Sequence, residues 1–253
     1  MELVEFFGAD KVITFMLLFA RLSGLIVFFP FFSHNQIPLI VKTLLVFALC
    51  IVLFPLSNAH EHAINFLIME ILSEAMLGLC AGLLLNIVFA ILQMAGEQIS
   101  MIMGFSMASV LDPQTGTNSP VIANILNFIA LLAFLMLDGH HLILQFYSTS
   151  LSAIPLGDFY PRSGVMSYTL KLFGNLFMFG FVLAFPIIAL SILSDAIFGM
   201  LMKTMPQFNL LVVGYPIKVS IGFSVLIAIL AGIIKIITDM MVQILNDMPA
   251  LFF

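Results

Sequence analysis

The sequence predicts an all-α membrane-assembly protein, and three observations support this fold class. Only 8% of its residues are charged and 62% are hydrophobic, whereas a soluble domain carries about 25% charged residues. The apolar segments reach the roughly 20 residues that a helix needs to cross a bilayer. These segments also lack the alternation of apolar and polar residues that marks strands. We therefore expect long kinked helices and helical hairpins, about six to eight helical segments in all.

The first two predicted helices form an antiparallel hairpin. An apolar span over 12–32 contains Arg21, and a second span runs from Pro38 to about Leu53. Pro38 suits the first turn of a helix, because the N–H that proline lacks would have no partner there. Only a short polar turn joins the two spans, so the second helix must return alongside the first.

A third, longer helix is predicted over 64–100, and a broken stretch follows it. Gly78 and Gly82 form a small-xxx-small pair that lets a second helix approach closely. The stretch 96–120 reads GEQISMIMGFSMASVLDPQTGTNSP and mixes apolar residues with Gly, Ser, Thr and Pro. Glycine permits unusual backbone angles and proline removes helical hydrogen bonds. We predict a loop with apolar side chains between two helices, an arrangement that suggests a gate.

The remainder of the chain continues with long apolar helices. They are predicted over 121–137, 141–153, 165–194 and 208–241. Pro186 is expected to kink the third of these, because proline interrupts the hydrogen-bond ladder. The stretch 195–206 is short and mixed, and we expect it to separate the last two helices. Ala228 and Gly232 provide a second small-xxx-small face on the final helix.

Charged residues inside the apolar segments are the most unusual feature of the sequence. A charge at the bilayer centre costs at least about 2.5–3.5 kcal/mol, so these side chains cannot all face lipid. They must pair with one another, line water or meet charges on other subunits; snorkelling is the alternative for Lys171, Lys235 and Asp239. We expect Lys218 and Glu97 to pair with opposite charges on neighbouring helices. The candidate buried or inter-subunit charges are Arg21, Lys42, Glu74, Glu97, Asp195, Lys203 and Lys218.

Methionines gather at the central break, and two explanations stay open. Flexible methionine side chains fill gaps in a protein core, or they close a passage and yield when something passes through. On the second explanation, apolar side chains of the loop form a seal, and glycine, aspartate and proline shape the path by which the loop returns to the next helix. The candidate residues for the seal are Met101, Met103, Gly104, Phe105, Met107, Val110, Leu111, Asp112, Pro113 and Gly116.

Sequence motifs for catalysis, nucleotide binding and metal binding give no positive signal. The chain has no phosphate-binding loop with a Gly-Lys-Ser/Thr end, so it is not a nucleotide-driven pump by itself. The His-Glu-His sequence at 60–62 could ligate a metal, with His34 or the 140–141 histidine pair, but such histidines are usually solvated. No metal or cofactor is predicted, and Cys50 and Cys80 are interpreted as buried thiols. Net charge −5 without a basic run excludes nucleic acid as a partner.

The stretch 205–218, MPQFNLLVVGYPIK, resembles the P-Q-x-N-x-x-x-x-G-x-P-x-K signature of the FliR family. The signature residues are Pro206, Gln207, Asn209, Gly214 and Pro216, followed by Lys218. Lys203 stands where many members have arginine, which keeps the charge, and Tyr215 stands where phenylalanine is common. Matching glycines, prolines and charges are spread along the whole chain, so the chain is identified as a member of this family.

This resemblance implies a non-enzymatic component of the flagellar type III export gate, in the bacterial inner membrane at the flagellar basal body. FliR-like proteins complete a ring with FliP-like and FliQ-like subunits and plug the channel through which unfolded substrates are exported. FlhB-like and FlhA-like export components are further expected partners.

Within the single subunit 1–253, the resemblance implies a FliP-like part over 1–160, with the plug loop at about 104–119, and a FliQ-like part over 161–253. Two alternatives remain. One is the homologous export-gate subunit of a virulence injectisome. The other is a stand-alone membrane protein, either a secondary transporter or an enzyme, that acts on a small molecule.

Overall fold

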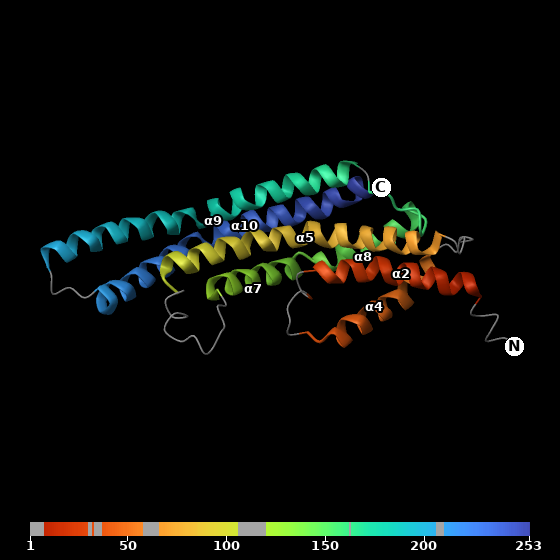
Figure 1. Cartoon of the computed structure of the whole chain (residues 1–253), viewed down its shortest axis with the longest axis horizontal. Coiled ribbons are helices and arrows are strands. Elements are labelled where there is room, and N and C mark those ends of the chain that lie inside the picture. The colour runs from red at the N-terminus through yellow and green to blue at the C-terminus, as the bar shows by residue number, and fades with distance from the viewer. Residues whose placement is uncertain are drawn as a thin grey trace. The chain divides into compact units, whose positions relative to one another are not determined.

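The computed structural model describes residues 8–29, 32, 37–57, 66–105, 120–161, 163–205 and 210–253. Its α-helices are α2 (Ala9–Phe28), α4 (Leu39–Leu53), α5 (Leu67–Met103), α7 (Val121–Met136), α8 (Gly139–Ala153), α9 (Ser163–Thr204) and α10 (Tyr215–Phe252) (Figure 1). A 3-10 turn, η1 (Phe54–Leu56), follows α4, and a π-helical turn, η3 (Leu210–Gly214), precedes α10. The described residues contain no strand, so the all-α prediction is confirmed.

Five of these helices, α2, α4, α5, α9 and α10, are long and apolar enough to cross a membrane. Helices α7 and α8 are bent by 62° at the short break between them and would count as a sixth span if taken together. Helices α5, α9 and α10 contain 37, 42 and 38 residues. Each is far longer than the roughly 20 residues that one crossing needs. A part of each of these three helices therefore extends beyond the hydrocarbon core.

The chain divides into two units by its internal contacts. Unit 1 comprises Met1–Ile87, Phe134–Leu172 and Met240–Phe253, and unit 2 comprises Val88–Ala133 and Phe173–Asp239. Helices α5, α9 and α10 each contribute residues to both units. The division into a FliP-like part over 1–160 and a FliQ-like part over 161–253 concerns likeness to other proteins, so it stays a prediction.

In unit 1, α2 and α4 form the predicted antiparallel hairpin. Phe15 lies near the start of α2, and its ring packs edge-on against Phe47 of α4 with centroids 5.3 Å apart. The same ring contacts Phe54, just after the end of α4, at 6.3 Å. Since the beginning of α2 meets the end of α4, the two helices run in opposite directions. Helix α4 begins at Leu39, so Pro38 is its N-cap residue and lies one position before the predicted first turn.

Helix α2 crosses α5 at a contact made by glycines. A Cβ atom added to Gly24 would lie 2.6 Å from the carbonyl oxygen of Ala75, and one added to Gly78 would lie 2.9 Å from the amide nitrogen of Leu25. A Cβ atom on Gly82 would lie 2.8 Å from the carbonyl oxygen of Leu25. The distances at Gly78 and Gly82, which both belong to α5, leave no room for a side chain. The predicted close approach at Gly78 and Gly82 is confirmed, and Gly24 is the partner that sequence reading missed.

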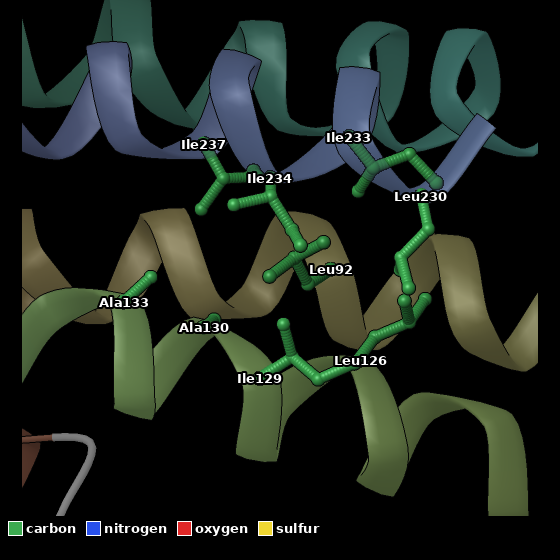
Figure 2. Close-up of a pocket in the computed structure, with 9 residues that line it drawn as sticks. All are labelled: Leu92, Leu126, Ile129, Ala130, Ala133, Leu230, Ile233, Ile234 and Ile237. Carbon is green, nitrogen blue, oxygen red and sulfur yellow. The ribbon is translucent and has the colours of Figure 1, made fainter. Parts of the chain in front are cut away.

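In unit 2, the second half of α5 packs against α7 and α10. A Cβ atom on Gly96 of α5 would lie 2.6 Å from the amide nitrogen of Ala123 in α7, so these two helices are in close contact. A cavity of about 10 Å³ lies where the three helices meet (Figure 2). Its lining residues are Leu92, Leu126, Ile129, Ala130, Ala133, Leu230, Ile233, Ile234 and Ile237. The lining side chains are all aliphatic, so the cavity has no groups to hold a polar ligand.

Two predicted helix boundaries are wrong. Residues 195–204 continue α9 instead of forming a separate mixed stretch, and α10 runs to Phe252 instead of ending near Met241. The segment 195–204 contains Ala, Leu, two Met and Lys, which favour a helix, and it lacks proline, so the helix continues through it. Beyond Met241, the buried residues Ile244, Met248 and Phe252 recur every four positions, which is the pattern of an amphipathic helix.

The glycine crossing gives a first test. Changing Gly24→Leu would force α2 and α5 apart, and we expect it to lower the free energy of unfolding by about 1–3 kcal/mol. Gly174→Ala in α9 is the matched control, because no atom lies within 4 Å of the added Cβ. The control should stabilise the helix by up to about 1 kcal/mol. Thermal unfolding in detergent measures the stability of both variants. Equal midpoint temperatures for the two would contradict a close contact of α2 and α5 at Gly24.

Candidate functional site

Helix α5 ends in a glycine cap directly before the predicted loop. Gly104 has a φ angle of +90°, which is unfavourable for residues with a Cβ atom. Its N–H donates to the carbonyl of Met101 at 3.1 Å, and the N–H of Phe105 donates to the carbonyl of Ser100 at 3.0 Å. These two bonds form a Schellman motif, which satisfies carbonyls at the helix end. The predicted break at Gly104 is therefore confirmed.

The residues 103–105, which we call the loop base, pack against the first turns of α10. Met103 is fully buried, and its Cγ atom would lie 2.9 Å from a Cβ atom added to Gly222. The Phe105 ring meets the Phe223 ring edge-on, with centroids 5.9 Å apart and planes at 81°. Met101, in contrast, is 68% exposed. The last turn of α5 thus presents one methionine to α10 and another outward.

Tyr215 completes the contact between the loop base and α10. A Cβ atom added to Gly104 would lie 2.6 Å from the Cζ atom of the tyrosine ring, so the ring fills the space that a side chain at 104 would need. Tyr215 is the first residue of α10 and follows the π-helical turn η3 directly. Turns of this kind are rare and frequently occur at functional sites. Sequence reasoning singled out both segments separately and missed that they touch.

Lys218 forms an ion pair with Asp195, which joins α10 to α9. Its Nζ atom lies 2.8 Å from both carboxylate oxygens. The lysine side chain is 14% exposed and the aspartate side chain 59%. Pairing lowers the cost of placing these charges on apolar helices. The predicted pairing of Lys218 with a charge on a neighbouring helix is confirmed.

A second, fully buried ion pair lies in unit 1. Arg21 of α2 donates from Nε and Nη2 to the two carboxylate oxygens of Glu74 in α5, and the second of these bonds is 2.9 Å long. Arg21 also donates from Nη1 to the Ser150 hydroxyl of α8 at 3.1 Å. The backbone N–H of Gly157, in the turn after α8, donates to Glu74 at 2.7 Å. One network therefore ties three helices and a turn together.

The remaining candidate charges have no ion-pair partner within the part of the chain that the structure describes. Glu97 is exposed on α5 and accepts a hydrogen bond from the side chain of Gln93 at 2.7 Å. Lys42 is half-buried in α4, and Lys203 is exposed in the last turn of α9. A cation in the last turn of a helix, as Lys203 is, interacts favourably with the helix dipole. For these three residues, a partner on another subunit stays a prediction.

Several predicted site residues lie outside the described residues. They are Met107, Val110, Leu111, Asp112, Pro113 and Gly116 of the loop, and Pro206, Gln207 and Asn209 of the signature. The histidines at 60 and 62 lie outside as well. Of the described signature residues, Gly214 is buried and Pro216 is exposed in the first turn of α10.

One group of potential metal ligands lies at the break between α7 and α8. The ligand atoms of Asp138, His140 and His141 are all within 4.8 Å of one another. The side chains of Asp138 and His141 are 77% and 73% exposed, and Nδ1 of His141 lies 4.0 Å from Oδ1 of Asp138. Exposed clusters of such residues are common without a bound ion, so the cluster does not by itself indicate a metal centre.

These features define an all-α membrane protein in which charges pair between helices and one long helix ends at a glycine cap. The sequence matches the family of bacterial export proteins, family 1, over residues 12–244, and the chain belongs to this family. Its relatives named flagellar biosynthetic protein FliR include that of Bacillus subtilis, which is 32% identical over 91% of both chains. That of Escherichia coli is 27% identical over 89% of this chain and 87% of the relative.

The corresponding protein of Aquifex aeolicus is 28% identical over 86% of this chain and 85% of its own. The prediction of the FliR family is therefore confirmed. The chain is a membrane-embedded component of a flagellar export apparatus. Membership of an export family agrees with the expectation that the chain is not an enzyme.

The buried ion pair gives a second test. Removing one partner, as in Arg21→Met, leaves an uncompensated buried carboxylate, and we expect a loss of about 3–5 kcal/mol in the free energy of unfolding. The double variant Arg21→Met/Glu74→Leu removes both charges and should recover most of that loss. Unfolding of the purified variants in detergent measures the difference. Losses that simply add in the double variant would contradict a coupled pair.

Proposed function

We propose that the chain is the plug-bearing subunit of a protein-export gate and completes a ring with FliP-like and FliQ-like membrane subunits. The observation that carries this proposal is an exposed face of α10 that suits protein better than lipid. Small and polar side chains recur on this face every three or four residues and so line up along the helix, with the exposed Ile227 beside them. The small and polar members are Ser220, Ser224, Ala228, Ala231, Lys235 and Asp239.

Helix α9 shows what a lipid-compatible surface looks like in the same unit. Between residues 173 and 193 most of its exposed residues are large and apolar, among them Phe173, Phe177, Phe181, Phe185 and Ile192. Hydrocarbon tails accommodate such side chains, whereas Lys235 and Asp239 would be costly there. Small residues also let a second helix approach closely, and a Cβ atom on Gly232 would meet nothing within 4 Å. The α10 face therefore fits a helix of a partner subunit.

The start of this face is hollowed. A groove of about 400 Å³ runs along the first turns of α10 and is open to one side. Its lining residues are Pro216, Ile217, Ser220, Ile221, Ser224 and Val225. A helix with small residues of its own would fill this groove, which supports a partner subunit as the occupant of the α10 face.

The plug is assigned to the segment at about 104–119. The helices on either side of it, α5 and α7, are in contact at Gly96 and Ala123. The segment therefore leaves one helix and returns to its neighbour. Met103 and Phe105 pack against α10, so in this proposal they anchor the segment, while Met101, Met107, Val110 and Leu111 present the apolar seal. Asp112-Pro113 and Gly116 shape its return.

The remaining parts of the proposal follow from family membership. We propose a FliP-like part over 1–160, a FliQ-like part over 161–253, contacts with FlhB-like and FlhA-like components, and export of unfolded proteins across the inner membrane at the basal body. Relatives that bear a flagellar name favour the flagellum over an injectisome. The aliphatic cavity of unit 2 offers no polar group to a small-molecule solute, so it does not support a stand-alone transporter.

The α10 face gives a third test. Ala231→Leu would place a bulky side chain where a partner helix is expected, and we expect it to reduce co-purification of FliP-like and FliQ-like subunits with the tagged chain several-fold, since overpacking costs about 1–3 kcal/mol. Phe177→Leu on the exposed side of α9 is the control and should leave co-purification unchanged. If both variants retain the partners equally, the α10 face is not an interface.

The plug gives a fourth test. Replacing residues 106–118 by a short Gly-Ser linker keeps the glycine cap of α5 and removes the proposed seal. We expect cells that express the whole complex to leak ions and small molecules, because nothing apolar would then close the channel. Ion flux and uptake of a small dye measure the leak, and co-purification confirms that the complex is present. An assembled complex with unchanged permeability would overturn the plug assignment.

A further inference from the structure

We infer that Tyr215 is a positioning residue for the plug, because its ring holds Gly104 at the point where the plug segment leaves α5. The inference rests on the proposed function and deepens it. It assigns to the signature region a role in keeping the plug in place, in addition to any role in assembly. The contact joins Gly104, at the end of α5, to Tyr215, the first residue of α10.

The contact is specific in its geometry. Gly104 adopts a φ angle of +90° and has no side chain, and the Tyr215 ring occupies the space beside its α-carbon. Phe105 stacks edge-on against Phe223, and Gly222 makes room for Met103. Positions 215, 222 and 223 are two helical turns apart and share one face of α10. The whole loop base therefore sits on a single helix face, with Tyr215 at its end.

Tyr215 is itself held firmly in place. The π-helical turn η3 precedes it, and Pro216 follows it in the first turn of α10, where proline fixes the backbone. Three residues further on, Lys218 is bound to Asp195 of α9 at 2.8 Å. The ion pair fixes the first turn of α10 to α9, and the ring of Tyr215 lies on that same turn.

Both the ring and the hydroxyl group of Tyr215 lie against Gly104. The atoms nearest to a Cβ added at Gly104 are Cε1, the hydroxyl oxygen Oη and Cζ of the tyrosine. The neighbouring contacts are aromatic and thioether contacts. Tyr215→Ala removes all these atoms, whereas Tyr215→Phe keeps the ring and should retain most of the contact. Gly104→Ala should displace the tyrosine side chain and, in addition, strain the backbone at a φ angle of +90°.

The experiment uses the complete export-gate complex expressed in cells. Each variant is measured for co-purification of partner subunits and for leakage of ions and a small dye. We expect Tyr215→Ala and Gly104→Ala to raise the leak about tenfold while the complex stays assembled, which corresponds to about 1.4 kcal/mol. The double variant should leak about as much as Gly104→Ala alone, since that variant has already lost the contact with the tyrosine. Tyr215→Phe, which keeps the ring, should leak less than Tyr215→Ala.

Phe177→Ala in α9 is the control, because it also removes an exposed aromatic ring but lies away from the loop base; it should not leak. The linker variant of 106–118 is measured in parallel. If that variant leaks and Tyr215→Ala does not, the positioning role is overturned and the plug assignment stands. If Tyr215→Ala leaks only where partner subunits are lost, the residue is structural and the inference is overturned. If the assembled linker variant does not leak, the plug assignment fails and the inference falls with it.

Discussion

Arg21 and Glu74 are fully buried among apolar helices, and the arrangement of unit 1 depends on their pairing. Either charge alone would be expensive in such surroundings, so the two helices that carry them gain most when they lie together. The glycines at 24 and 78 allow that approach by letting the backbones of α2 and α5 nearly touch. Ser150 and Gly157 then satisfy the remaining hydrogen-bonding groups, which draws α8 and the following turn into the same network.

The same constraint organises unit 2 in a different way. Lys218 and Asp195 pair between α10 and α9, but part of the pair stays exposed, and Lys235 and Asp239 remain on the surface of α10. A lone membrane protein would gain from replacing such residues by leucine. A subunit of a larger assembly keeps them, because a partner or water meets them. The contrast with the large apolar residues exposed on α9 gives the proposed export-gate role a physical basis.

The end of α5 is fixed by two kinds of contact. The Schellman motif at Gly104 ends the helix in a defined direction, and Tyr215, Gly222 and Phe223 contact the three residues of the loop base. The proposed plug would need a firm attachment at its ends. In that proposal the loop base provides one attachment, and the contact between Gly96 and Ala123 holds the next helix, α7, against α5.

The amino-acid sequence alone determined the helical class, the hairpin of α2 and α4, the break at Gly104 and the family. These features are encoded locally, by hydrophobic periodicity, by glycine and proline, and by a signature that occupies adjacent positions. Sequence reading misplaced the ends of α9 and α10, because no local residue marks a helix end where burial or an ion pair with another helix continues the helix. Only the tertiary structure decided that Arg21 meets Glu74 and that Gly104 meets Tyr215. Such contacts join residues far apart in the chain, and helix crossing, not local pattern, brings them together.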